Sequence, residues 1–61
     1  MSYEDACALE RAIEGLIKVQ DRKMEEAAYA GDRRTYEHHA GVTDVLEHVL
    51  SMVKNVSGLY A

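Results

Sequence analysis

The sequence of 61 residues contains no proline, tryptophan or phenylalanine, and it has a single cysteine, Cys7. With one cysteine the chain cannot build a disulfide framework, which is a common support of very small domains. Without proline, no residue lacks the backbone N–H that a helix interior needs. The absence of proline is therefore compatible with long helices. Because disulfides are excluded, we expect self-association to supply the additional stability that a chain of this length needs.

Further absences concern location and partners. The formal net charge is -4 at pH 7, whereas a generic nucleic-acid-binding protein is basic. No apolar run approaches the roughly 20 residues of a membrane-spanning helix. The N-terminal segment carries Glu4 and Asp5, unlike the basic and then apolar start of a signal peptide. We therefore expect a cytoplasmic protein that binds other proteins, with no membrane contact and with a nucleic-acid partner disfavoured.

The residue types that are present indicate two helices with well-marked ends. The chain is 48% hydrophobic and 30% charged, which is typical of a helical bundle. Ser2 is a favourable N-cap, and Asp5 three residues later completes a capping box. Gly31 is expected to end the first helix in the left-handed conformation, and Asp32 is expected to cap a second helix at once.

The apolar residues on the two sides of Gly31 mirror each other. The first stripe consists of Ala6, Leu9, Ile13, Leu16 and Gln20, and the second, read backwards, of Val56, Val53, Val49, Leu46 and Val42. Both stripes have spacings of 3, 4, 3 and 4, and the members of each facing pair lie equally far from Gly31. The pattern predicts an all-α, antiparallel two-helix hairpin that turns at Gly31, with helices over about 3–30 and 33–57 in one domain of residues 1–61.

The apolar residues form faces that are wider than a two-stranded contact needs. Ile17 and Met24 flank the first stripe, and Val45, Leu50 and Met52 flank the second. Because a face of this width touches more than one neighbour, we expect the hairpin to assemble into a homodimeric four-helix bundle. The expected core and dimer-interface residues are Leu9, Ile13, Leu16, Ile17, Gln20, Val42, Val45, Leu46, Val49, Leu50, Met52, Val53 and Val56.

Polar residues interrupt the two stripes near the turn. Gln20 is expected to face Val42, where its amide either fixes the alignment through a buried partner or leans to the rim and bonds water. His39 continues the second stripe toward the turn. Gly41 followed by Thr43 offers a stop and a new N-cap, so the second helix either breaks there or runs through.

Two sets of polar residues are candidates for binding. Asp44 and His48 are four residues apart, so they share a helix face on which a metal ligand pair is conceivable; solvated side chains are the favoured interpretation, and no cofactor is expected. A possible contact patch near the turn consists of Arg22, Tyr29, Arg33, Arg34 and Tyr36. Basic residues with interleaved aromatics are used for RNA or phosphate, although acidic residues at the same end offset their charge.

The sequence favours a non-enzymatic function. It has neither a nucleophile with a base and orienter nor a glycine-rich phosphate loop. The leading hypothesis is a small interaction or regulatory protein that acts as a helical-bundle homodimer. An alternative is an acidic inhibitor or antitoxin-like protein that covers a larger target with its exposed apolar face.

A third hypothesis is an RNA-binding hairpin dimer. In length and pattern the chain resembles the Rop hairpins that control plasmid copy number. The resemblance implies a short helix–turn–helix chain that dimerises into a four-helix bundle and binds RNA loops. It spans the whole chain, but no motif aligns, so it assigns no role to an individual residue.

Overall fold

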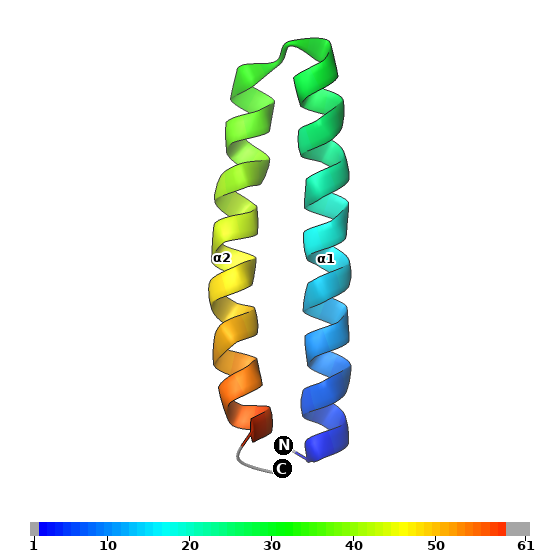
Figure 1. The fold of residues 1–61 in the computed structure, drawn as a ribbon, viewed down its shortest axis with the longest axis vertical. Helices are drawn as coiled ribbons and strands as arrows, with labels where there is room; N and C mark the ends of the chain where they lie inside the picture. The colour runs from blue at the N-terminus through cyan, green and yellow to red at the C-terminus, as the bar shows by residue number, and fades with distance from the viewer. Residues whose placement is uncertain (1, 59–61) are drawn as a thin grey trace.

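The computed structural model describes residues 2–58 and shows two long helices folded into a hairpin (Figure 1). Helix α1 spans Tyr3–Ala30 and helix α2 spans Arg33–Gly58, beside the expected ranges of about 3–30 and 33–57. No strand occurs between residues 2 and 58. The prediction of an all-α hairpin is confirmed. Met1 and residues 59–61, which the expected domain also includes, lie outside the described residues.

Side chains cap the N-terminal ends of both helices as the sequence predicts. The Ser2 hydroxyl accepts the Asp5 N–H at 3.1 Å, and the Asp5 carboxylate accepts the Ser2 N–H at 3.4 Å. At α2, the Asp32 carboxylate accepts the Thr35 N–H at 3.1 Å and the Thr35 hydroxyl at 2.6 Å. The hydroxyl bond and then the amide bond stabilise the ionised carboxylate and lower the pKa of Asp32.

Backbone geometry at the turn closes α1 and reverses the chain. Gly31 has φ 70° and ψ 20°, a left-handed conformation that costs a residue with a Cβ about 1–2 kcal/mol. The Gly31 N–H donates to the Ala28 carbonyl at 3.2 Å, and the Asp32 N–H donates to the Ala27 carbonyl at 2.9 Å. This pair of bonds is a Schellman motif, which satisfies carbonyls that the helix end leaves unpaired. Because only two residues separate the helices, α2 must return alongside α1.

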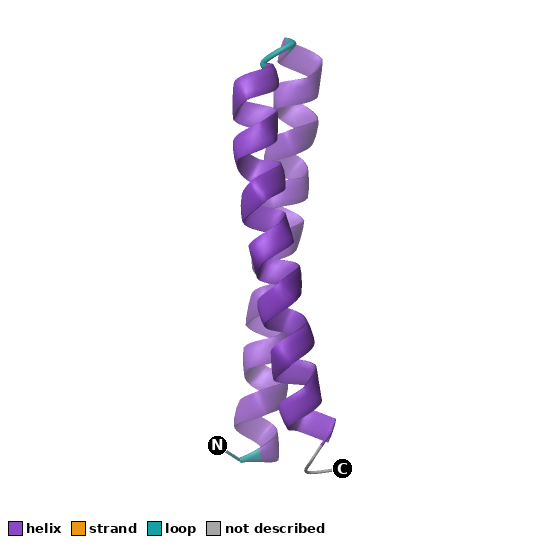
Figure 2. Ribbon diagram, turned by 90° about the vertical axis from the view of Figure 1, so that its left-hand side faces the viewer, coloured by secondary structure: helices purple, strands orange, loops and turns teal. Residues whose placement is uncertain are grey.

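The hairpin is long and one helix thick, as the two views at right angles show (Figure 2). Its principal extents are 44, 14 and 13 Å, and its radius of gyration is 14.0 Å. A compact domain of the same length would have a radius of gyration of about 10.5 Å. The shape therefore leaves each helix with a single neighbour. No helix within residues 2–58 offers a stretch long and apolar enough for a membrane span.

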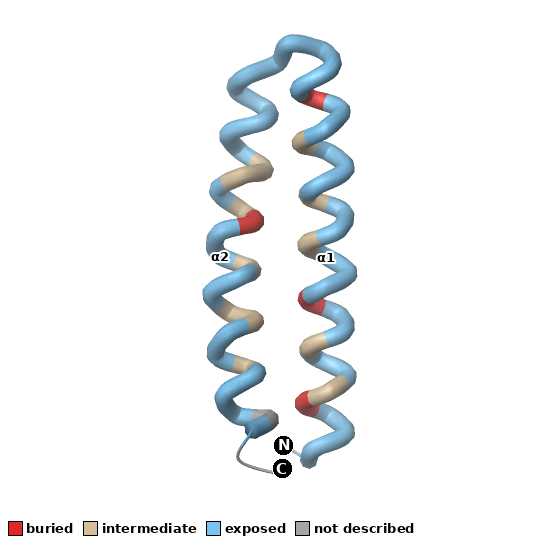
Figure 3. The backbone as a smooth tube through the Cα atoms, in the orientation of Figure 1, coloured by how far each residue is buried: buried red, intermediate tan, exposed pale blue. Residues whose placement is uncertain are grey.

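The two helices meet along a narrow seam, where the buried and half-buried residues face one another (Figure 3). On α1 the seam consists of Ala6, Glu10, Ile13, Ile17, Gln20, Met24 and Ala27, with alternating spacings of 4 and 3. Ala6, Ile13 and Gln20 belong to the expected stripe. Leu9 and Leu16 do not face α2: they are 38% and 50% exposed, and Ile17 takes the inward position beside Leu16.

A choice between two alternating sets explains this correction. Around the shared positions, the seam can include either the set of Leu9, Leu16 and Lys23 or the set of Glu10, Ile17 and Met24. Both sets fit the 3.5-residue repeat. Each set brings one charged residue into the seam, seven residues from an end of α1: Lys23 before Ala30 in the first set and Glu10 after Tyr3 in the second. In the observed seam Glu10 is half-buried, and Met24 takes the inward position that Lys23 would have taken. The observed seam leaves the two leucines outside.

On α2 the seam contains a buried threonine, and the helix is continuous. Thr43 is 8% exposed, the lowest value among the residues of α2 whose burial is described, and Leu46, Leu50 and Val53 follow it as half-buried seam residues. The alternative of a break at Gly41 is not realised, because α2 runs through this residue without interruption. Thr43 therefore caps no new helix and instead packs against α1.

Candidate functional site

One side of the hairpin carries a continuous band of apolar side chains, all of them exposed except the half-buried Val42 and Val49, and we name this band the apolar face. Its members are Leu9, Ala12, Leu16 and Val19 of α1 and Val42, Val45, Val49, Met52 and Val56 of α2. The spacings are 3, 4 and 3 on α1 and 3, 4, 3 and 4 on α2. Each helix thus has a second apolar stripe beside the one that forms the seam.

Helix geometry places the two second stripes on the same side of the molecule. On α1, Leu16 precedes the seam residue Ile17, and on α2, Val42 precedes the seam residue Thr43. One residue back along an α-helix is a rotation of about 100° away from the seam. Because α1 and α2 run in opposite directions and face each other, the two rotations lead to the same side of the hairpin.

The exposure of these side chains is large for apolar residues. Val45 is 63% exposed, Leu16 50% and Met52 49%. Along α2 the side chains leave a shallow groove of about 130 Å³, lined by Val49, Met52, Val53 and Val56. Between residues 2 and 58 only Ala6, Ile13 and Ala27 are buried hydrophobic residues. The hairpin therefore exposes more large apolar side chains on this face than it buries in its seam.

The opposite side of the hairpin is charged. Most positions that follow the seam residues are charged, and they include the exposed residues Glu14, Lys18 and Asp21 on α1 and Asp44, Glu47 and Lys54 on α2. Charged groups on this side keep their hydration without any neighbour. One side of the hairpin is thus apolar and the other is charged, as are the inner and outer sides of a helix in a bundle.

Polar residues bound the apolar face at both ends. Toward the turn the same helical positions are occupied by Lys23 and Glu26 on α1 and by His38 on α2, and toward the chain ends by Asp5. The apolar face is therefore a finite patch in the half of the hairpin that is remote from the turn.

A polar layer joins the two helices between the apolar face and the turn. Gln20 Oε1 lies 2.6 Å from His39 Nδ1, so the imidazole N–H donates to the amide oxygen. Gln20 therefore satisfies its amide oxygen within the hairpin, through a residue three positions before the predicted neighbour Val42. The Thr43 hydroxyl donates to the His39 carbonyl at 2.9 Å, since its one proton favours this oxygen over Met24 Sδ at 3.6 Å.

The residues proposed as a contact patch at the turn do not gather on one surface. Arg22 and Tyr29 follow the seam residues Gln20 and Ala27 by two positions, which places both on the side of α1 that points away from α2. Tyr29 is 88% exposed.

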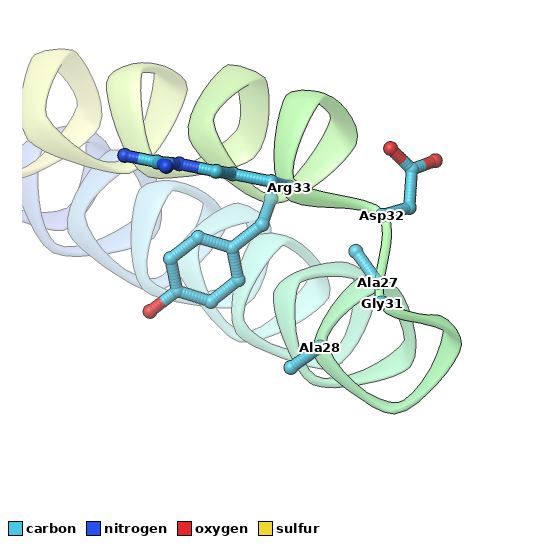
Figure 4. A pocket seen from close by; sticks show the side chains of 6 residues that line it. Ala27, Ala28, Gly31, Asp32 and Arg33 are labelled. Atoms are coloured by element: carbon cyan, nitrogen blue, oxygen red, sulfur yellow. The ribbon is translucent and has the colours of Figure 1, made fainter.

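The patch residues of α2 are divided in the same way. Arg33 pairs with Glu37 at 3.0 Å, in an exposed ion pair that spans one helical turn. Arg34 is exposed, and Tyr36 is 41% exposed at the turn. A shallow hollow of about 240 Å³ lies there, lined by Ala27, Ala28, Gly31, Asp32, Arg33 and Tyr36. The Asp32 carboxylate points away from the helix pair, where it serves the cap (Figure 4).

The histidine and cysteine residues do not assemble a reactive or metal-binding group. Asp44 and His48 are both exposed, and residues 2–58 contain no cluster of three or more His, Cys, Asp or Glu side chains that could hold a metal ion. Cys7 is half-buried one helical turn from Tyr3, and a hydrogen bond with Cys7, followed by the Coulomb interaction with the same residue, raises the pKa of Tyr3. This contact was not anticipated from the sequence.

Comparison with known proteins adds no relationship. No family model matches the chain, and neither a curated protein nor a solved structure is significantly similar to it. The resemblance to the Rop hairpins therefore remains one of length and pattern. The apolar face is the surface from which a function can be argued.

Proposed function

We propose that this protein is a small, non-enzymatic interaction or regulatory module that acts as a helical-bundle homodimer, with the apolar face as the contact between the two copies. One observation carries the proposal: Leu9, Leu16, Val19, Val45, Met52 and Val56 lie on one face and are 38–63% exposed. Exposed apolar patches of this continuity mark interaction surfaces in soluble proteins.

A second copy of the chain fits this face in size and chemistry. In projection one face of the hairpin measures 44 by 14 Å, which is roughly 600 Å² before the relief of the side chains is counted, beside about 800 Å² per partner in a standard interface. An apolar surface is matched by another copy of the same surface without an unpaired charge. When two hairpins pack face to face, each pair of helices also gains a second layer of helices against which its apolar face is buried.

The gain in free energy is of the right order for association. Burying the exposed half of six aliphatic side chains contributes about 1 kcal/mol each, or about 12 kcal/mol for both copies. Association costs roughly 4–15 kcal/mol in lost freedom of motion. A dimer held by this face alone is therefore reversible rather than permanent, as suits a regulatory protein.

The charged sides of both hairpins then point outward, and they are the surfaces that a further protein would meet. We place the dimer in the cytoplasm, because its single thiol has no disulfide partner within the chain and suits a reducing compartment.

Light scattering after gel filtration, over a series of concentrations, tests the proposal. The chain has a mass of 6.8 kDa, and we expect twice that mass at high concentration. A monomer at every concentration would refute the homodimer. In that case the apolar face would be a surface for a larger target protein, and the inhibitor hypothesis would replace the present one.

A further inference from the structure

We infer that two copies pack with their turns at opposite ends, related by a two-fold axis that passes the level of Ala12 and Val49. The inference rests on the proposed homodimer and specifies its arrangement. Ala12 lies 19 residues before Gly31 and Val49 lies 18 residues after it, so the two residues occupy nearly the same level of the antiparallel hairpin. Val49 is the central member of the apolar face on α2, and Ala12 is one of its two central members on α1.

A two-fold axis at this level, perpendicular to the helices, makes the apolar face complementary to itself. It places α1 against the partner's α1 in the opposite direction and α2 against the partner's α2. Leu9 then meets the partner's Leu16, and Ala12 meets its own copy. On α2, Val45 meets the partner's Met52, and Val49 meets its own copy. On α2 the same axis also sets Val42 opposite the partner's Val56. Of the apolar face only Val19 is left outside the match, at the level of the partner's Asp5 and Ala6.

The sizes of the side chains agree with this axis. On α1 the residue at the axis is Ala12, the smallest member of the apolar face, and its larger neighbours Leu9 and Leu16 stand one turn away on either side. Two helices that cross at an alanine approach closely, and the large side chains on either side fill the space beside the crossing.

Charge decides between this arrangement and the one with both turns at the same end. The same-end arrangement is also apolar against apolar, but it sets Lys23 beside the partner's His38, where no carboxylate lies on the same face of the partner's α2 to attract it. It also brings together two chain ends that each carry Glu4, Asp5 and Glu10. Like charges in contact disfavour association.

The opposite-end arrangement relieves this repulsion. Lys23 lies 11 residues beyond Ala12, so this arrangement sets it beside the N-terminus of the partner's α1, about one helical turn from the acidic residues Glu4 and Asp5. The attraction is modest in water and is weakened by salt, yet it has the right sign at both ends of the bundle.

The arrangement leaves both turns outside the bundle. The axis is nearer to the chain ends than to the turn, so each turn projects by about 13 Å beyond the partner's chain ends, at 1.5 Å per helical residue. The exposed Tyr29 and Arg34 of each copy therefore stay uncovered, and the two turns lie at the far ends of the dimer.

A distance between two spin labels tests the arrangement. Tyr29→Cys in a Cys7→Ala background places one label on each copy, at a residue that is 88% exposed and lies outside the seam. Tyr29 lies 17 residues beyond Ala12, so we expect a distance of about 50 Å by pulsed dipolar spectroscopy. A distance below about 30 Å, of the order of the width of a bundle of 10–12 Å helices, would overturn the inference.

Oxidative crosslinking provides an independent readout. Ala12→Cys in the same background should form a crosslinked dimer, because each residue meets its own copy at the axis. Ser51→Cys, on the charged side, is the matched control and should remain uncrosslinked. Crosslinking of Ser51→Cys but not of Ala12→Cys would overturn the inference. A dimeric mass with a short label distance contradicts only the arrangement, whereas a monomeric mass contradicts the proposed function as well.

Discussion

Replacing Met52 with glutamate places a charge in the middle of the apolar face of α2 without touching the seam. Met52 is 49% exposed in the single hairpin, so its carboxylate replacement reaches water and the hairpin retains its fold. In the proposed dimer the same position is covered by the partner. The adjacent substitution Ser51→Glu introduces the same group, the same charge and the same helix propensity one residue away, on the charged side. The two variants differ only in the side of the helix that carries the new carboxylate.

The expected magnitude follows from burial. Losing the apolar contact of Met52 costs about 1 kcal/mol in each copy, which is half the value of a fully buried methionine. Covering a carboxylate without a partner costs at least another 1–3 kcal/mol in each copy. Because the two-fold axis doubles each effect, Met52→Glu should weaken the dimer by about 4 kcal/mol or more, and its Kd should rise about 1000-fold. Ser51→Glu should leave the Kd unchanged within a few-fold.

Light scattering over a concentration series measures both variants, and circular dichroism confirms that each remains helical. The reasoning is refuted if Met52→Glu dimerises as well as Ser51→Glu does, because the apolar face then lies outside the contact. Loss of helix in Met52→Glu alone would also contradict it, since the single hairpin would then need this face in order to fold.

Three further predictions concern the hairpin itself. In urea denaturation, Gly31→Ala should lower the free energy of unfolding by about 1–2 kcal/mol, because Gly31 is the one described residue with a positive φ. Gly41→Ala should raise the free energy of unfolding by about 1 kcal/mol, because Gly41 lies within a helix without a positive φ. Neither added methyl group meets an atom within 4 Å. In a double-mutant cycle, Gln20→Leu and His39→Leu should show a coupling of about 1 kcal/mol, and strict additivity would contradict the hydrogen bond between them. The pKa of Asp32 is lower in the folded state than the ordinary pKa of an aspartate. The cap therefore stabilises the fold fully when the pH is above the ordinary pKa, and this stabilisation is lost as the pH falls through the lowered pKa of the folded state. Asp32→Ala should therefore lower the melting temperature at neutral pH and have little effect in strong acid; an equal effect at both pH values would argue against the ionised cap.

The ends of the helices were predictable from the sequence because their causes are local. The capping pair Ser2 and Asp5 lies within one turn, and so do Gly31 and the Asp32 cap that follows it. Hydrogen bonds between residues this close in sequence form in the same way whatever the rest of the chain does.

The candidate site was predicted only as a set of residues. Val45 and Met52 were expected as flanking interface residues, and both lie on the apolar face. The grouping of Leu9 and Leu16 with them was missed, since the mirror pattern had assigned these leucines to the contact within the hairpin. The proposed cluster at the turn is divided among different sides of the two helices, because proximity in sequence to a turn does not specify a direction around each helix.

The sequence by itself determined two helices, their ends and their antiparallel return, because short-range hydrogen bonds and a single left-handed glycine specify them. Only the tertiary structure decided which apolar stripe faces inward. Ile17 and Leu16 are neighbours that satisfy the same 3.5-residue repeat. The choice between them also decides which other residues turn inward: Glu10 and Met24 with Ile17, or Leu9 and Lys23 with Leu16. The hydrogen bond between Gln20 and His39 also depends on the tertiary structure, because only the packing of α1 on α2 brings together these residues, which are 19 positions apart.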